Sequence, residues 1–127
     1  MRLSEYCDRR WPNLCSLMTI YYGQDFIDDF GSPEGALQAI LYGSAERRWP
    51  PWSKDQLTAV LRELEEFMEF ARDYLRKHPE KKEDDVLDML GCAYNTYASG
   101  FTPLQWLEYL GNRIREHLEK IQKQDAS

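Results

Sequence analysis

The fold is decided by residues 53–77, which read SKDQLTAVLRELEEFMEFARDYLRK. Ser53 and Gln56 have the spacing of a capping box, in which each side chain accepts a hydrogen bond from the backbone N–H of the other residue. Beyond the box, apolar residues recur at steps of four and three, as one face of a helix requires. They are Leu57, Leu61, Leu64, Met68, Ala71 and Leu75. The pattern predicts the longest helix of the chain over 54–77, ended by Pro79.

Similar stripes predict further helices over residues 12–22, 33–42, about 80–99 and 103–121. Three of them have a proline in the first turn, where its missing N–H costs nothing. No segment has a convincing strand pattern, and tandem prolines exclude a helix from the connector 46–52. We therefore predict an all-α protein, a single compact domain of about five main helices over residues 1–127.

Two shorter parts of the chain have less definite patterns. Residues 25–31 fit a short helix or a turn that ends at Gly31, and the polar tail 122–127 is expected to fray. The core is expected to contain the inward-facing residues of the predicted helices. These are Leu17, Phe26, Phe30, Leu37, Leu61, Leu64, Met68, Leu90, Tyr94, Trp106, Leu110 and Ile114.

Composition limits the kind of protein and the kind of partner. Hydrophobic residues are 43% and charged residues 30% of the 127, a balance typical of a globular domain. Three cysteines without framework spacing and no signal-peptide pattern lead us to expect a reduced, cytoplasmic protein. The net charge of −6 disfavours binding to nucleic acid or to anionic membranes, and it favours a basic partner.

The sequence has no pattern typical of a catalytic or metal site. His78 and His117 stand near the ends of predicted helices, where a histidine is favourable for the helix dipole, and zinc-ligand spacing is absent. There is no phosphate-binding glycine loop and no calcium-loop spacing around Asp25. The acids 84–88 fall in a predicted first turn, where negative charge is favourable. We expect no enzyme activity, no cofactor and no metal, although a cysteine–histidine pair formed in space stays an open alternative.

Two acidic clusters stand out among the charged residues. Residues 24–34 contain Asp25, Asp28, Asp29 and Glu34 without a base, and residues 63–73 contain Arg72 as their only base. Glu65, Glu69 and Asp73 follow one another at steps of four, and like charges at that spacing cost a helix roughly 0.2–0.5 kcal/mol per pair. The clusters fit either a solvated face or a surface that binds a cationic partner.

Residues 14–43, LCSLMTIYYGQDFIDDFGSPEGALQAILYG, carry a resemblance to a known family. In this pattern a helix ends in a pair of aromatic residues. After the pair come a polar residue, an aspartate and another aromatic residue. An aromatic residue followed by glycine then precedes the next helix. The residues in question are Tyr21, Tyr22, Gln24, Asp25, Phe26, Phe30 and Gly31. A second match comprises Gly91, Tyr94, Gly100, Phe101, Thr102, Trp106 and Leu107. Together the two matches resemble the helical immunity proteins of contact-dependent growth inhibition, the CdiI type.

The resemblance implies a bacterial protein that is not an enzyme and that neutralises a toxin by binding it, as a 1:1 heterodimer. The partner would be the C-terminal toxin domain of the cognate surface-delivered effector (the CdiA C-terminal domain), expected to be a basic nuclease. This chain differs from shorter members in its long third helix and in its connector 49–52, which are expected to set toxin choice. The alternative is a helical adaptor or regulatory protein that binds a basic partner unrelated to toxins.

We expect acidic residues to steer the partner and aromatic residues to anchor it, because electrostatics raises association rates and aromatic side chains dominate binding hot spots. The candidate toxin-binding residues are Asp25, Asp28, Asp29, Glu65, Glu66, Glu69, Asp73, Tyr22, Trp49 and Trp52.

Overall fold

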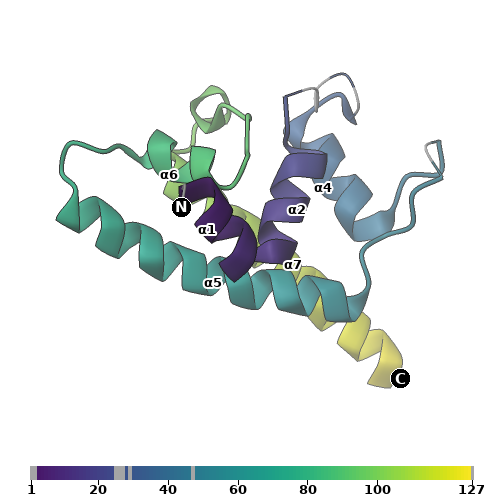
Figure 1. The fold of residues 1–127 in the computed structure, drawn as a ribbon. Coiled ribbons are helices and arrows are strands. Elements are labelled where there is room, and N and C mark those ends of the chain that lie inside the picture. Colours follow the sequence, from purple (N-terminus) through teal and green to yellow (C-terminus); the bar gives the residue numbers. More distant parts are fainter. Residues whose placement is uncertain (1–2, 25–27, 29, 47, 127) are drawn as a thin grey trace.

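The computed structural model describes residues 3–24, 28, 30–46 and 48–126 of the chain as an all-α domain (Figure 1). Its elements are α1 (Leu3–Arg10), α2 (Pro12–Tyr21), α4 (Pro33–Tyr42), α5 (Lys54–Lys77), α6 (Glu83–Met89), the 3-10 helix η1 (Thr96–Ser99) and α7 (Pro103–Ala126). The described residues contain no strand, only an isolated bridge between Ser44 and Trp49. The predicted fold class is confirmed.

The start signals predicted from the sequence are present in the structure. The capping box of α5 forms, with Ser53 Oγ accepting from Gln56 N at 3.1 Å and Gln56 Oε1 accepting from Ser53 N at 2.9 Å. Ser32 caps α4 in the same way by accepting from Gly35 N. These bonds satisfy N–H groups that the first turn of a helix leaves without partners.

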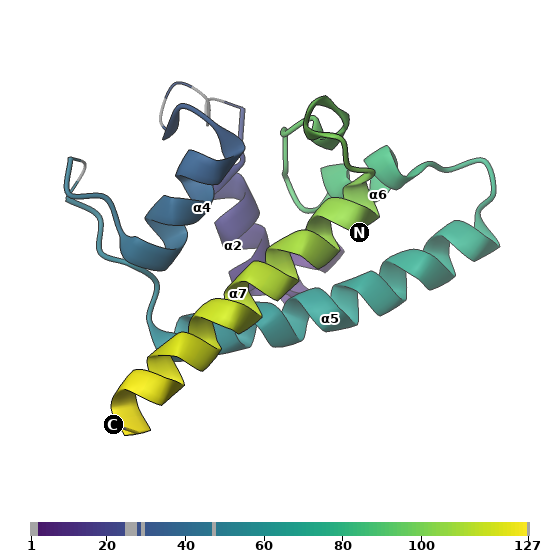
Figure 2. The same ribbon diagram turned by 180° about the vertical axis from the view of Figure 1, so that it is seen from behind.

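The two longest helices, α5 and α7, cross each other along one side of the molecule (Figure 2). Gly111 lies at this crossing, where a Cβ would make a tight contact of 3.2 Å with Leu64 Cδ2. Helix α2 packs on α5, α4 packs on α2, and α1 contacts both α2 and α6. The core therefore lies between the α5–α7 pair and the shorter helices.

Three predictions about elements were wrong. Helix α1 was not expected, because LSEYCDRR has no apolar stripe; it contacts the core through Cys7, which is fully buried. The helix expected over 80–99 ends at Met89, since Gly91 takes φ +77° and the chain continues without helical structure to η1. Helix 54–77 is not longer than every other helix, because α5 and α7 both have 24 residues. Fraying of the tail stays a prediction, with α7 extending to Ala126.

Most of the predicted core residues are buried. Phe30 and Leu61 are the exceptions, since both are only partly buried against the core, and Phe26 lies outside the described residues. The buried residues are Leu17, Leu37, Leu64, Met68, Leu90, Tyr94, Trp106, Leu110 and Ile114.

Candidate functional site

The acidic face of α5 is less acidic in the structure than in the sequence. Glu65 forms an ion pair with Arg115 of α7, with 2.9 Å between the carboxylate oxygen and the guanidinium nitrogen. Asp73 pairs with Lys77 at 2.9 Å and also with Arg76. The interpretation of Glu65 and Asp73 as acids without compensating bases was therefore wrong, because one base comes from a distant helix and the others from the next turn.

Glu66 and Glu69 are exposed on the same helix and line a shallow groove of about 570 Å³. Three arginines, Arg10, Arg72 and Arg76, line the groove with them. A surface of such mixed charge attracts a cationic partner less than an acidic one does. The excess of negative charge that made this face a candidate binding surface in the sequence is therefore not present in the structure.

Glu63, in the same stretch of sequence, is a structural residue. Its side chain is 4% exposed and reaches the first turn of α2, where Oε1 accepts from Asn13 N at 2.9 Å and from Leu14 N at 3.3 Å. Oε2 accepts from Asn13 Nδ2 at 2.6 Å. Trp11 stands at the N-cap of α2 without a capping side chain, so a carboxylate from α5 caps this helix instead.

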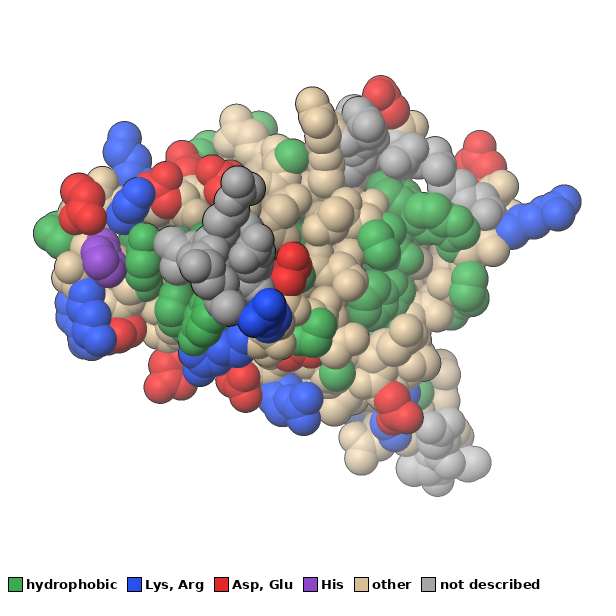
Figure 3. All heavy atoms as spheres, viewed as in Figure 1, with side chains coloured by type: hydrophobic (Ala, Val, Ile, Leu, Met, Phe, Trp, Pro, Cys, Tyr) green, Lys and Arg blue, Asp and Glu red, His purple; other side chains and the backbone are tan. Residues whose placement is uncertain are grey.

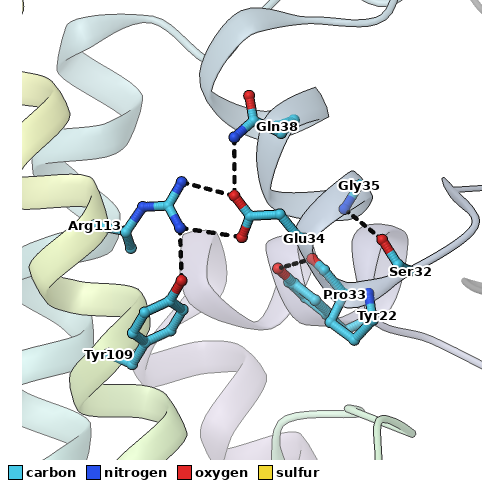
Figure 4. Close-up of polar contacts among 8 residues, drawn as sticks. All are labelled: Tyr22, Ser32, Pro33, Glu34, Gly35, Gln38, Tyr109 and Arg113. Carbon is cyan, nitrogen blue, oxygen red and sulfur yellow. Dashed lines mark hydrogen bonds and ion pairs between the residues drawn. The ribbon is translucent and has the colours of Figure 1, made fainter. Parts of the chain in front are cut away.

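The start of α4 is held against α7 by a second polar network (Figure 4). Arg113 donates to both carboxylate oxygens of Glu34, at 2.8 and 3.0 Å, and to the hydroxyl of Tyr109 at 2.6 Å. Gln38 also donates to Glu34. The hydrogen bond from Arg113 lowers the pKa of Glu34, against the opposing effect of partial burial. Glu34, which has no base near it in the sequence, is therefore a paired group that fixes α4.

Tyr22 is a core residue, which corrects its prediction as an anchor. It is 1% exposed, its ring packs edge-on against Trp106 at 4.8 Å between centroids, and its hydroxyl donates to Pro33 O. Burial, as the largest cause, raises its pKa well above the ordinary range of a tyrosine. Its side chain is not accessible to a partner in this structure.

Trp49 and Trp52, by contrast, line a groove on the surface. Both are partly buried, and their rings contact Tyr21 edge-on at 5.8 and 6.0 Å between centroids. The groove has a volume of about 360 Å³, and its lining includes Pro50, Pro51 and Ile20, which is 50% exposed. We call this feature the aromatic groove. Figure 3 shows hydrophobic side chains gathered on this face, between α4 and the start of α5.

The aromatic groove has a rigid frame. Ser44 and Trp49 exchange two backbone hydrogen bonds of 2.9 Å, and Trp52 N donates to Ile40 O at 2.9 Å. Gly43 permits this return of the chain, since it takes φ +80° and a Cβ there would lie 2.8 Å from Trp49 O. The connector is thus closed by backbone bonds on both sides of its two prolines. Sequence reasoning found the tryptophans but missed Ile20, which the helical pattern places on the outer face of α2.

The remaining acidic candidates are only partly described. Asp28 is exposed, and Asp25 and Asp29 lie outside the described residues. The first turn of α4, which follows Asp28 closely in the chain, lies at the opposite edge of the molecule from α5 in both views (Figures 1 and 2). The part of the first cluster that lies in this turn, Glu34, is therefore not next to the carboxylates of α5.

The described residues form a small helical domain with an aromatic groove on its surface. Within the described residues no group of three His, Cys, Asp or Glu side chains is placed to hold a metal ion. None of the described helices is long and apolar enough to cross a membrane.

The CdiI immunity protein family matches residues 10–114 of the chain. The chain belongs to this family, so it is an immunity protein of contact-dependent growth inhibition. Membership implies neutralisation of a toxin, and immunity proteins of this kind are generally not enzymes. Neither the curated proteins nor the solved structures contain a significant match.

Proposed function

We propose that the protein binds the toxin domain of its cognate effector one-to-one in the cytoplasm and blocks it by occlusion, without chemistry of its own. The toxin is a basic domain of nuclease type. Family membership supports a toxin as the partner rather than an unrelated protein. The net charge of −6 supports a basic partner, because complementary charge speeds association and disfavours wrong partners.

The aromatic groove forms the centre of the proposed interface, and this observation carries the proposal. Binding hot spots are rich in tryptophan and lie in well-packed pockets that exclude water. The frame of Gly43, Trp49 and Trp52 is already ordered by backbone hydrogen bonds, so little conformational entropy is lost on binding. An apolar side chain of the toxin would fill the groove and contact Ile20.

Exposed carboxylates have a secondary part in this proposal. Asp28, Glu66 and Glu69 have exposed side chains and add to the negative field that steers a basic toxin. Exposed charges individually contribute little to affinity and act mainly on the association rate. The paired Glu65 and Asp73 are no longer candidates for direct contact, because Arg115 and Lys77 already neutralise them.

The test is binding to the toxin domain encoded directly upstream, with rescue of growth on co-expression and a complex mass equal to one copy of each partner. Ile20→Glu places a charge in the aromatic groove and is expected to weaken binding at least tenfold. Tyr42→Glu is the matched control, because Tyr42 is similarly exposed (56%) and lies outside the groove lining. Equal affinity of Ile20→Glu and wild type would exclude the groove from the interface, and absence of binding by wild type would refute the proposed partner.

A further inference from the structure

A pocket of about 290 Å³ lies between the start of α4, the residues around η1 and the first turns of α7, and we call it the α4–α7 pocket. Its lining is mainly apolar and is dominated by aromatic side chains. The aromatic residues are Tyr22, Tyr94, Phe101, Trp106 and Tyr109. Four of the five belong to the two sequence stretches singled out above, and none of them lines the aromatic groove. The proposed interface therefore leaves this pocket without a role.

The walls of the pocket are formed before any partner binds. Tyr22 and Tyr94 each pack edge-on against Trp106, at 4.8 and 5.1 Å between ring centroids, and all three residues are at most 7% exposed. Phe101 and Tyr109 stack on each other at 5.2 Å and are only partly buried. The pocket thus combines buried rings with half-exposed ones, so a side chain can enter it with little rearrangement of the walls.

The hydroxyl groups of the three tyrosines already have partners inside the protein. The bonds join Tyr22 to Pro33 O, Tyr94 to Ser99 Oγ, and Tyr109 to the guanidinium of Arg113. An occupant therefore meets mainly ring surfaces rather than free hydroxyls. The face of an aromatic ring carries partial negative charge, so it attracts a cation, and the attraction is strongest where water is excluded.

The charges around the pocket also favour a cation. Among the described residues that line it, Glu34 is the one charged residue. Residues 83–112, which contribute most of the lining, contain five acidic residues and no lysine, arginine or histidine. The acids are Glu83, Asp84, Asp85, Asp88 and Glu108. Even with the three bases that flank it, Lys81, Lys82 and Arg113, this segment keeps an excess of acids. The surroundings of the pocket therefore have a negative potential.

Glu34 can accept one more hydrogen bond. A carboxylate has about four acceptor sites. Arg113 donates to both oxygens and Gln38 donates to Oε1, so three of these sites are used (Figure 4). The Glu34 side chain is 51% exposed, so the remaining site can accept from a group that approaches from solvent. The hydrogen bond from Arg113 lowers the pKa of Glu34, and the group is therefore ionised at neutral pH.

A lysine side chain suits the pocket better than an arginine side chain does. Its stem of methylene groups matches the apolar walls, and its ammonium group has fewer N–H donors than a guanidinium group. A buried donor without an acceptor weakens binding, and the pocket has few free acceptors. Resting on the proposed function, which makes the partner a basic toxin, we infer that the α4–α7 pocket receives a lysine side chain of the toxin, whose ammonium group lies over the aromatic rings and reaches Glu34.

The first experiment compares affinities for the toxin domain encoded directly upstream. Phe101→Leu keeps an apolar wall but removes the ring, so it is expected to lower affinity about fivefold or more. Because Phe101 is only partly buried, the variant is expected to fold as wild type does, which a thermal melt checks. The control is Tyr42→Leu, which makes the same kind of change at a position that is 56% exposed and outside the lining, and its affinity should stay close to that of wild type. Unchanged affinity of Phe101→Leu, or an equal loss in the control, would overturn the lysine site.

A second experiment identifies the occupant directly. The toxin is labelled with isotopically enriched lysine and purified as its complex with the immunity protein, for NMR. Protons held over the face of an aromatic ring resonate upfield, so one lysine Hε signal is expected upfield of all the others in the wild-type complex and back among them in the Phe101→Leu complex. If every lysine signal lies in the ordinary range, the pocket does not hold a lysine and the inference is wrong, while the immunity function stands. Failure of wild type to bind the toxin at all would refute the proposed function instead.

Discussion

Replacing Glu63 by alanine is expected to destabilise the fold strongly, although the residue belongs to a stretch of α5 that is rich in charged residues. The side chain is 4% exposed and provides the acceptors for the N–H groups of Asn13 and Leu14 at the start of α2. A hydrogen bond to a charged group contributes about 1.5–3 kcal/mol, and two buried donors lose their acceptor. Allowing for partial repair by water, the variant should lose about 3 kcal/mol of unfolding free energy.

The assay is urea unfolding at neutral pH, in which the midpoint should fall without a change in the slope. For a domain of this size the loss corresponds to a melting temperature lower by roughly 10 °C. Glu63→Gln keeps the shape and one acceptor oxygen, so it should lose about half as much.

Glu65→Ala is the matched control for Glu63→Ala. It removes the same side chain two residues further along α5, where the ion pair with Arg115 is exposed. Exposed ion pairs contribute about 0–1 kcal/mol, so this variant should unfold close to wild type. Equal losses in the two alanine variants, or a loss below about 1 kcal/mol for Glu63→Ala, would refute the assignment of Glu63 as the cap of α2.

Three further predictions concern the core, pH and metals. Leu64→Ala should lower the unfolding free energy by about 2–5 kcal/mol in denaturant melts, because Leu64 is 1% exposed at the α5–α7 crossing; a change below about 0.5 kcal/mol would contradict this. The Glu34–Arg113 pair lowers the pKa of Glu34 in the folded state, so its stabilising effect is complete above the ordinary value of 4.5 and is lost as the pH falls through the lowered pKa. Acid unfolding curves of wild type should therefore fall more steeply below that pH than curves of Glu34→Gln. EDTA should change neither the melting temperature nor toxin binding, and a clear drop in either would show that a metal is required.

The local signals in the sequence predicted most of the fold. The capping box of α5, the prolines in first turns and the apolar stripes of α2, α4, α5 and α7 act over a few residues, so they can be read without knowing the fold. The helix expected over 80–99 shows the limit of this reasoning. Its stripe continued beyond Gly91, but Gly91 takes φ +77° and the backbone leaves the helix there. The periodicity of apolar residues alone does not show where a glycine takes a backbone angle that ends the helix.

The contacts that charged side chains make within the protein were the hardest feature to predict, because the contacting residues come from distant parts of the chain. The sequence placed Glu63 and Glu65 in one acidic run. The structure buries Glu63 under α2, about 50 residues away, and pairs Glu65 with Arg115. Tyr22 was equally ambiguous, since an aromatic side chain suits both a core and an interface.

The sequence by itself determined the helical class, most helix starts, the acidic character and the family resemblance, because all of these depend on residue types and short spacings. Only the tertiary structure decided which charges are neutralised, which aromatic side chains reach the surface, and that Ile20, Trp49 and Trp52 line one groove. Those properties depend on which helix faces lie against each other. That packing depends on all the core residues together, so no single residue or short stretch of the sequence predicts it.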